Sequence, residues 1–145
     1  MTHVYLDGHM EKAHAGDAGY DLYYDGDDDV TVYPGTVIMV PTGVKRLSMD
    51  DTMMALVVSR SGLTYRHGVI VANAPGVIDS GYRGPVNCLM TNVTTTPYTI
   101  TPGERIAQLL FVKVETPHIT ISGDDNDFAD SDSRGEHGFG SSGKH

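Results

Sequence analysis

Short β-type segments separated by turn-forming residues run along most of this chain, and this pattern constrains its fold most. Pairs such as Pro34-Gly35 and Pro102-Gly103 lie between runs rich in Val, Ile, Thr and Tyr. The best helical candidate is only the short segment Gly62–His67. Many short strands without alternating helices predict an all-β sandwich, jelly roll or barrel. The expected strands are Val30–Tyr33, Thr36–Val40 (ended by Pro41), Met54–Val58, Val69–Ala72, Val86–Thr91, Tyr98–Thr101, Ile106–Val114 and His118–Ser122.

The composition changes near residue 123. The chain has 145 residues, of which 39% are hydrophobic, and this is enough for one core domain. From Gly123 onward Gly, Ser, Asp and His dominate, and such a segment buries too little apolar surface to order itself alone. The sequence therefore predicts an all-β core over residues 1–122 and a flexible C-terminal arm over residues 123–145 that closes over an active site.

The charge balance excludes some partners. A formal net charge of −9 argues against nucleic-acid binding, which needs a basic face. The acidic runs 25–29 and 124–127 lack the spacing of a calcium loop and are interpreted as solvated turns. No apolar run approaches the ~20 residues that span a bilayer, so no membrane partner is expected. With one cysteine, Cys88, and no visible secretory signal, a cytoplasmic location is expected.

Two stretches suggest a particular chemistry, although the first of them, taken alone, is more simply a turn with a surface arginine. In Ser59–Leu63, the guanidinium of Arg60 and the hydroxyl of Ser61 suit a phosphate, and Gly62 lets a backbone N–H approach it closely. The stretch Gly76–Gly84 is interpreted as a β-hairpin whose free edge could pair with a pyrimidine. Asp79 is the candidate general base that orients a water molecule, although an Asp that only closes a turn is the plainer alternative.

Five stretches, taken in order, resemble the motifs of the trimeric all-β dUTPases. The resemblance extends from about residue 15 to the C-terminus. It implies a distorted jelly roll or barrel of the β-clip type, with one short helix and a C-terminal arm. It also implies a homotrimer with shared active sites, and hydrolysis of dUTP to dUMP and pyrophosphate. The stretches are Ala18–Leu22 (AGYDL), Ser59–Leu63 (SRSGL), Gly76–Gly84 (GVIDSGYRG), Gly103–Leu110 (GERIAQLL) and Arg134–Gly143 (RGEHGFGSSG).

The same resemblance implies roles for individual residues. Asp79 activates the water that attacks the α-phosphorus, and the ring of Tyr82 excludes a ribose 2′-hydroxyl. The tight hairpin of the third stretch leaves no room for the methyl group of thymine. The uracil and deoxyribose contacts are Asn73, Gly76, Val77, Ile78, Tyr82, Asn87 and Phe139. The phosphate contacts are Arg60, Ser61, Gly62, Gln108, Arg134, Gly140, Ser141 and Ser142.

A metal ion completes these expectations. An acidic chain that binds a triphosphate needs counter-charge, and Mg²⁺ prefers phosphate oxygens and water. The ion is therefore expected to be bound mainly through the substrate phosphates. By resemblance Asp21 contacts it through water only, and a structural carboxylate bonded to the backbone or to an arginine is the alternative. Arg105 is expected to be structural, paired with an acid or with a neighbouring subunit.

Two other functions remain open from the sequence. A dCTP deaminase, alone or bifunctional, shares the fold, but such relatives carry a Glu just beyond the third stretch and lack the ending Arg134–Gly143. Residues 87–90 here contain no acid. A regulatory interaction protein on the same fold is the other alternative, with the acidic loops 25–29 and 124–132 as its contact surface.

Overall fold

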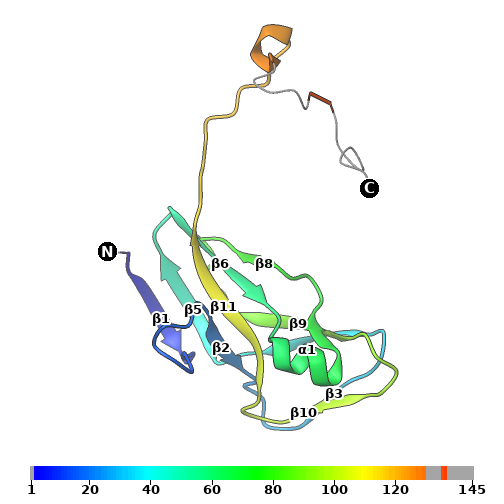
Figure 1. Cartoon of the computed structure of the whole chain (residues 1–145). Coiled ribbons are helices and arrows are strands. Elements are labelled where there is room, and N and C mark those ends of the chain that lie inside the picture. The colour runs from blue at the N-terminus through cyan, green and yellow to red at the C-terminus, as the bar shows by residue number, and fades with distance from the viewer. Residues whose placement is uncertain (1, 130–134, 137–145) are drawn as a thin grey trace. The chain divides into compact units, whose positions relative to one another are not determined.

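Eleven strands, one α-helix and one 3-10 helix make up the part of the chain that the computed structural model describes, residues 2–129 and 135–136 (Figure 1). The N-terminal strands are β1 (Val4–Gly8), β2 (Tyr20–Tyr23), β3 (Val30–Val32), β4 (Val37–Pro41), β5 (Val44–Met49) and β6 (Met53–Val58). After helix α1 (Ser61–His67) follow β7 (Val69–Val71), β8 (Gly76–Ile78), β9 (Asn87–Asn92), β10 (Tyr98–Ile100), β11 (Arg105–Lys113) and the 3-10 helix η1 (Asp125–Phe128). The expectation of an all-β chain with one short α-helix is confirmed.

Four antiparallel sheets form the core unit, which spans Met1–Glu115. The largest has the order β2-β11-β6-β8, and a three-stranded sheet has the order β4-β9-β7. Two further pairs, β1-β5 and β10-β3, complete the set. The sheets do not close into one barrel, so the jelly-roll description fits better than a closed barrel.

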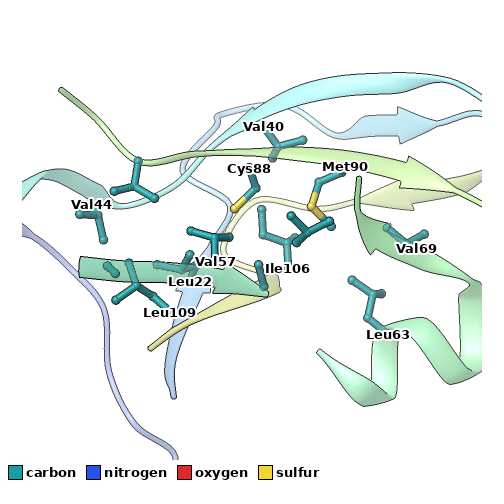
Figure 2. Close-up of a cluster of buried hydrophobic side chains, with 14 of the residues drawn as sticks. Leu22, Val40, Val44, Val57, Leu63, Val69, Cys88, Met90, Ile106 and Leu109 are labelled. Atoms are coloured by element: carbon teal, nitrogen blue, oxygen red, sulfur yellow. The ribbon is translucent and has the colours of Figure 1, made fainter. Parts of the chain in front are cut away.

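The hydrophobic core lies between the two larger sheets (Figure 2). In β6, residues 53, 55 and 57 are buried and alternate with partly exposed neighbours, as the two-residue repeat of a strand requires. Leu22 and Leu109 of the four-stranded sheet and Met90 of the three-stranded sheet are fully buried. Leu63 of α1 joins the same cluster, so the helix packs on the core through one apolar side chain.

Seven of the eight predicted strands are present, with bounds within one residue of the prediction. The eighth, His118–Ser122, is wrong: these residues form no strand, and Ile119 and Ile121 are 79% and 98% exposed. The sequence predicted that Pro41 would end β4 from outside it. Pro41 is instead the last residue of this strand and stands opposite Asn87. This position is allowed because β4 is an edge strand, where a missing N–H breaks no ladder.

The sequence did not predict β1, β2 and β5 as strands. The predicted helix is present and begins one residue earlier, at Ser61, and Gly68 ends it in the left-handed conformation with φ 63°. The core unit ends at Glu115, whereas the sequence predicts a boundary after residue 122. The second unit, Thr116–His145, contains η1, where the Asp124 carboxylate accepts a hydrogen bond from the Asn126 N–H. No described helix is long and apolar enough to cross a membrane.

Candidate active site

A cavity of about 300 Å³ lies beside β8 and gathers the residues predicted to hold a nucleoside. Strands β6 and β8 supply part of its wall, and β9 and the loop before it supply another part. Every described residue of the predicted uracil and deoxyribose site lines the cavity. These residues are Asn73, Gly76, Val77, Ile78, Tyr82 and Asn87. Asp79, the candidate general base, lines it as well. The structure thus brings the third stretch and its flanks to one place.

The predicted β-hairpin at Gly76–Gly84 is wrong as a ladder. Strand β8 pairs with β6, whereas β9 pairs with β4 and β7. The strand before the loop 79–86 and the strand after it therefore lie in different sheets. The loop between them closes a turn in which the Tyr82 N–H donates to the Asp79 carbonyl at 3.1 Å. Because β8 is the outermost strand of its sheet, one side of its backbone has no strand partner in the described chain.

The side chain of Tyr82 is held against its own loop. Its hydroxyl donates to the carbonyl of Pro85 at 2.7 Å, and its ring lies so close to Gly84 that a Cβ there would collide with it. Asp79, the first residue after β8, is exposed and available to a ligand. A tyrosine fixed in this way can act as a rigid wall, which steric discrimination requires.

The apolar wall of this cavity was not foreseen from the sequence. Its side chains read as ordinary core residues, and no local signal separates them from other buried strand positions. The unforeseen residues are Met39, Val57, Val71, Pro85, Val86, Cys88 and Leu89. Burial raises the pKa of the Cys88 thiol to about 12, so this side chain is a neutral part of the wall and not a nucleophile.

A second cavity, of about 310 Å³, gathers the predicted phosphate contacts of the described chain. Arg60, Ser61, Gly62 and Gln108 line it, and so does the candidate metal contact Asp21. Sheet order explains the meeting, because β11 lies between β2 and β6 and Gln108 stands opposite both Asp21 and Val58. Arg60 follows β6 after one residue, Ser59, and is the N-cap residue of α1.

Asp21 faces two guanidiniums, and of these two arginines only Arg60 lines this cavity. Its Oδ1 lies 3.4 Å from Arg60 Nε, and its Oδ2 lies 3.7 Å from Arg105 Nη1. The Asp21 side chain is only 13% exposed, so solvent screens these contacts less than surface pairs. The expected pairing of Arg105 with an acid is therefore present. Both carboxylate oxygens face an arginine, which fits the structural alternative for Asp21.

The amide of Gln108 is also fixed from two sides. Its Nε2 donates to the Ser59 carbonyl at 3.0 Å. On the other side its Oε1 lies so close to Gly19 that a side chain at that position would displace it. The amide therefore faces the cavity in one orientation, which explains a glycine in the first stretch. In the described residues no group of three or more His, Cys, Asp or Glu side chains is gathered as a metal cage.

The two cavities are separate within one chain, and they share no lining residue. In the register between β6 and β8, Ile78 stands opposite Ala55, so Asp79 lies near Met54. Arg60 lies six residues farther along the chain, which corresponds to about 20 Å of extended strand. Asp79 and Arg60 of the same chain therefore lie near opposite ends of β6.

A third cavity of about 380 Å³ adjoins the other side of Arg60 and was not predicted. Here the Tyr98 hydroxyl donates to Glu104 Oε1 at 2.9 Å. Burial, followed by this hydrogen bond, raises the pKa of Tyr98 to about 12, so the phenol stays neutral. The predicted contacts Arg134, Phe139, Gly140, Ser141 and Ser142 lie outside the described residues.

Comparison with known proteins identifies what this geometry resembles. The dUTPase family matches residues 9–143. A deoxyuridine 5'-triphosphate nucleotidohydrolase of Mycolicibacterium gilvum is 46% identical over 92% of this chain and 86% of its own. The dUTPase of Staphylococcus bacteriophage 80alpha with dUPNHPP is 28% identical, with a TM-score of 0.82 over 99% of this chain and 98% of that chain. A mutant dUTPase of phage phi11 of S. aureus, which coordinates a structural Mg(II) ion, is 23% identical with a TM-score of 0.73 over 86% and 97% of the two chains, and shows the fold alone.

Asp21→Asn tests the pairing of the two guanidiniums. The change removes the negative charge between Arg60 and Arg105, and we expect a loss of about 1 kcal/mol in the free energy of unfolding, since both arginines are partly exposed. Urea denaturation at one fixed protein concentration measures it. Asp7→Asn is the matched control, because it removes an exposed pair with Arg46 and should leave stability unchanged. Equal stabilities of the two variants would contradict the pairing role.

Proposed function

The chain belongs to the dUTPase family and is a dUTP diphosphatase, and we propose that it acts through a water molecule oriented by Asp79. One observation carries the proposal: the Asp79 carboxylate and the six described residues of the base and sugar site line a single cavity. The substrate's α-phosphorus then lies next to the base that activates the water. The named relative supports dUTP hydrolysis over the dCTP deamination that the sequence left open.

Uracil and deoxyribose occupy the cavity beside β8. Its size of about 300 Å³ falls at the lower end of small-molecule sites. The unpaired side of β8 offers backbone donors and acceptors to the pyrimidine, and Asn73 and Asn87 add side-chain amides. The Tyr82 ring lies beneath the sugar and collides with a ribose 2′-hydroxyl. Phe139, from the arm, stacks on the base.

Asp79 acts as the general base. Its carboxylate accepts a proton from water while the water oxygen forms a bond to the α-phosphorus. The bond from this phosphorus to the oxygen that bridges to the β-phosphate breaks, and pyrophosphate leaves with the electron pair. The products are dUMP and pyrophosphate. The exposed position of Asp79 at the end of β8 supports this role, because a base must reach the water directly.

The phosphates occupy the cavity around Arg60. Arg60, Ser61, Gly62 and Gln108 line this cavity, and we assign them to the phosphates together with Arg134, Gly140, Ser141 and Ser142 of the arm. A bound Mg²⁺ would neutralise charge on the phosphates. Asp21 would contact the ion only through water, because its two oxygens already face Arg60 and Arg105.

The complete site is shared between chains of a homotrimer. The separation of about 20 Å between Asp79 and Arg60 along β6 supports this arrangement, because one triphosphate must contact both groups. Asp79 of one protomer then meets Arg60 of its partner. The arm, residues 123–145, supplies Arg134 and Phe139 and closes the site. The free thiol of Cys88 fits a reducing, cytoplasmic location.

The first test is a nucleotide panel. Purified protein is incubated with dUTP, UTP, dTTP and dCTP, with Mg²⁺ and with a chelator, while pyrophosphate release is measured. We expect dUTP to be hydrolysed far faster than the others, and the chelator to suppress the rate. Asp79→Asn should lose at least about 100-fold in kcat while dUTP binding persists, since the amide cannot accept the proton. Wild-type turnover in Asp79→Asn would refute the base assignment.

Mixing two inactive variants tests the shared site. Asp79→Asn and Arg60→Met are each inactive if both groups are needed. In trimers assembled from an equal mixture, about a quarter of the sites combine an intact Asp79 with an intact Arg60 from a different chain. We expect about that share of wild-type activity, measured as pyrophosphate release from the co-expressed variants. A mixture no more active than its two components would mean that one chain supplies both groups.

Truncation after Asp132 tests the arm. We expect the shortened chain to keep its circular-dichroism spectrum and its size, but to lose more than about 100-fold in kcat/KM, because closure over the substrate is lost. Arg134→Met in the full chain separates the effect of one guanidinium from that of the whole arm. Full activity of the truncated chain would contradict closure.

A further inference from the structure

The loop that carries Asp79 and Tyr82 depends on attachments outside the proposed mechanism. It leaves the four-stranded sheet after Ile78 and enters the three-stranded sheet at Asn87. No ladder joins its two ends in the described chain, so its position must be set by other contacts. Two side chains, Thr42 and Arg83, make contacts of this kind.

Thr42 fixes the end of the loop. It lies in the short connection between β4 and β5 and is 3% exposed. Its hydroxyl donates to the Val86 carbonyl at 2.6 Å and accepts from the Val44 N–H at 3.2 Å. The Val86 N–H in turn donates to the Val44 carbonyl at 3.0 Å. A hydroxyl has one hydrogen to donate, and Thr42 donates it to the Val86 carbonyl.

Arg83 fixes the middle of the loop. Its Nη1 donates to the Ser80 carbonyl at 2.6 Å and lies 3.4 Å from the Leu47 carbonyl on β5. The neighbouring Arg46 lines the same surface hollow but points to Asp7, at 3.0 Å, and not to the loop. The two arginines therefore form a natural pair for comparison.

These attachments end at the tyrosine ring. The Tyr82 hydroxyl donates to the carbonyl of Pro85, the residue before Val86. A short path of bonds thus connects buried Thr42, through Val86 and Pro85, to the ring that faces the sugar. We propose that Thr42 and Arg83 are positioning residues that set the place of Tyr82 and so determine discrimination against a 2′-hydroxyl. This inference rests on the proposed contact between Tyr82 and the deoxyribose.

Steric exclusion is sensitive to small displacements. A ring that is free to move away from the sugar makes room for one hydroxyl, and the unwanted nucleotide gains more than the correct one. The relevant readout is the ratio of kcat/KM for dUTP to that for UTP. A residue that only stabilises the fold would lower the melting temperature and leave this ratio unchanged below it.

Thr42→Val and Thr42→Ser form the main test. Valine has the same shape but no hydroxyl, whereas serine keeps it. We expect the dUTP-to-UTP ratio to fall about tenfold in Thr42→Val and to stay near wild type in Thr42→Ser. Thr31→Val is the matched control, since the Thr31 hydroxyl contacts only Thr99 among the bonds of the described chain, and it should not change the ratio.

If Thr42→Val does not fold, Arg83→Met and Arg46→Met test the positioning role in its place. Both changes remove a guanidinium from the same exposed surface, but only Arg83 contacts the loop. We expect a several-fold lower ratio in Arg83→Met and a wild-type ratio in Arg46→Met. A wild-type ratio in both Thr42→Val and Arg83→Met, or in Arg83→Met alone where Thr42→Val does not fold, would overturn the inference.

Tyr82→Ala separates this inference from the proposed function. If Tyr82→Ala lowers the ratio while the Thr42 and Arg83 variants do not, the sugar contact stands and the positioning role falls. If Tyr82→Ala itself keeps the wild-type ratio, the sugar contact is wrong and the positioning role falls with it.

Discussion

The hydrogen-bonded register of β6 governs the placement of Asp79 and of the described phosphate contacts. This strand is paired with β11 on one side and β8 on the other. Its end leads into Arg60, next to Gln108 and Asp21, while its beginning stands opposite the end of β8 and Asp79. Because a strand is nearly inextensible, the predicted phosphate contacts around Arg60 and the candidate general base Asp79 are kept apart within a chain. The same register that stabilises the sheet therefore supports the proposal that the complete site is shared between chains.

Local sequence predicted the strands whose residues are mainly β-branched or aliphatic, such as β6 and β11. It failed for β1, β2 and β5, which mix charged and polar residues with apolar ones, so only pairing with a distant segment makes them strands. It also failed in the opposite direction at His118–Ser122, where alternating isoleucines are a strand pattern without a partner among the described residues. A strand is defined by its neighbour, and single-sequence patterns do not contain the neighbour.

The polar site residues were easier to predict than the cavity wall. Arg60, Asp79 and Tyr82 belong to short motifs in which charge, turn geometry and glycine occur together, and such combinations are rare outside binding loops. Cys88 and Leu89, in contrast, are typical residues of a buried strand. Which faces of such residues line a cavity depends on how two sheets diverge. The sequence analysis expected a simple hairpin and therefore did not predict that β8 and β9 belong to different sheets.

Electrostatics and close packing together fix the positions of the polar side chains at the candidate site. In a chain with net charge −9, an anionic substrate is attracted only where guanidiniums are concentrated. Asp21 brings Arg60 and Arg105 together, although it is itself an acid, because a shared carboxylate offsets their mutual repulsion. Gly19 and Gly84 let Gln108 and Tyr82 lie closer to the backbone than any other residue would allow. The glycines of these motifs therefore serve the positions of neighbouring side chains more than the freedom of their own backbone.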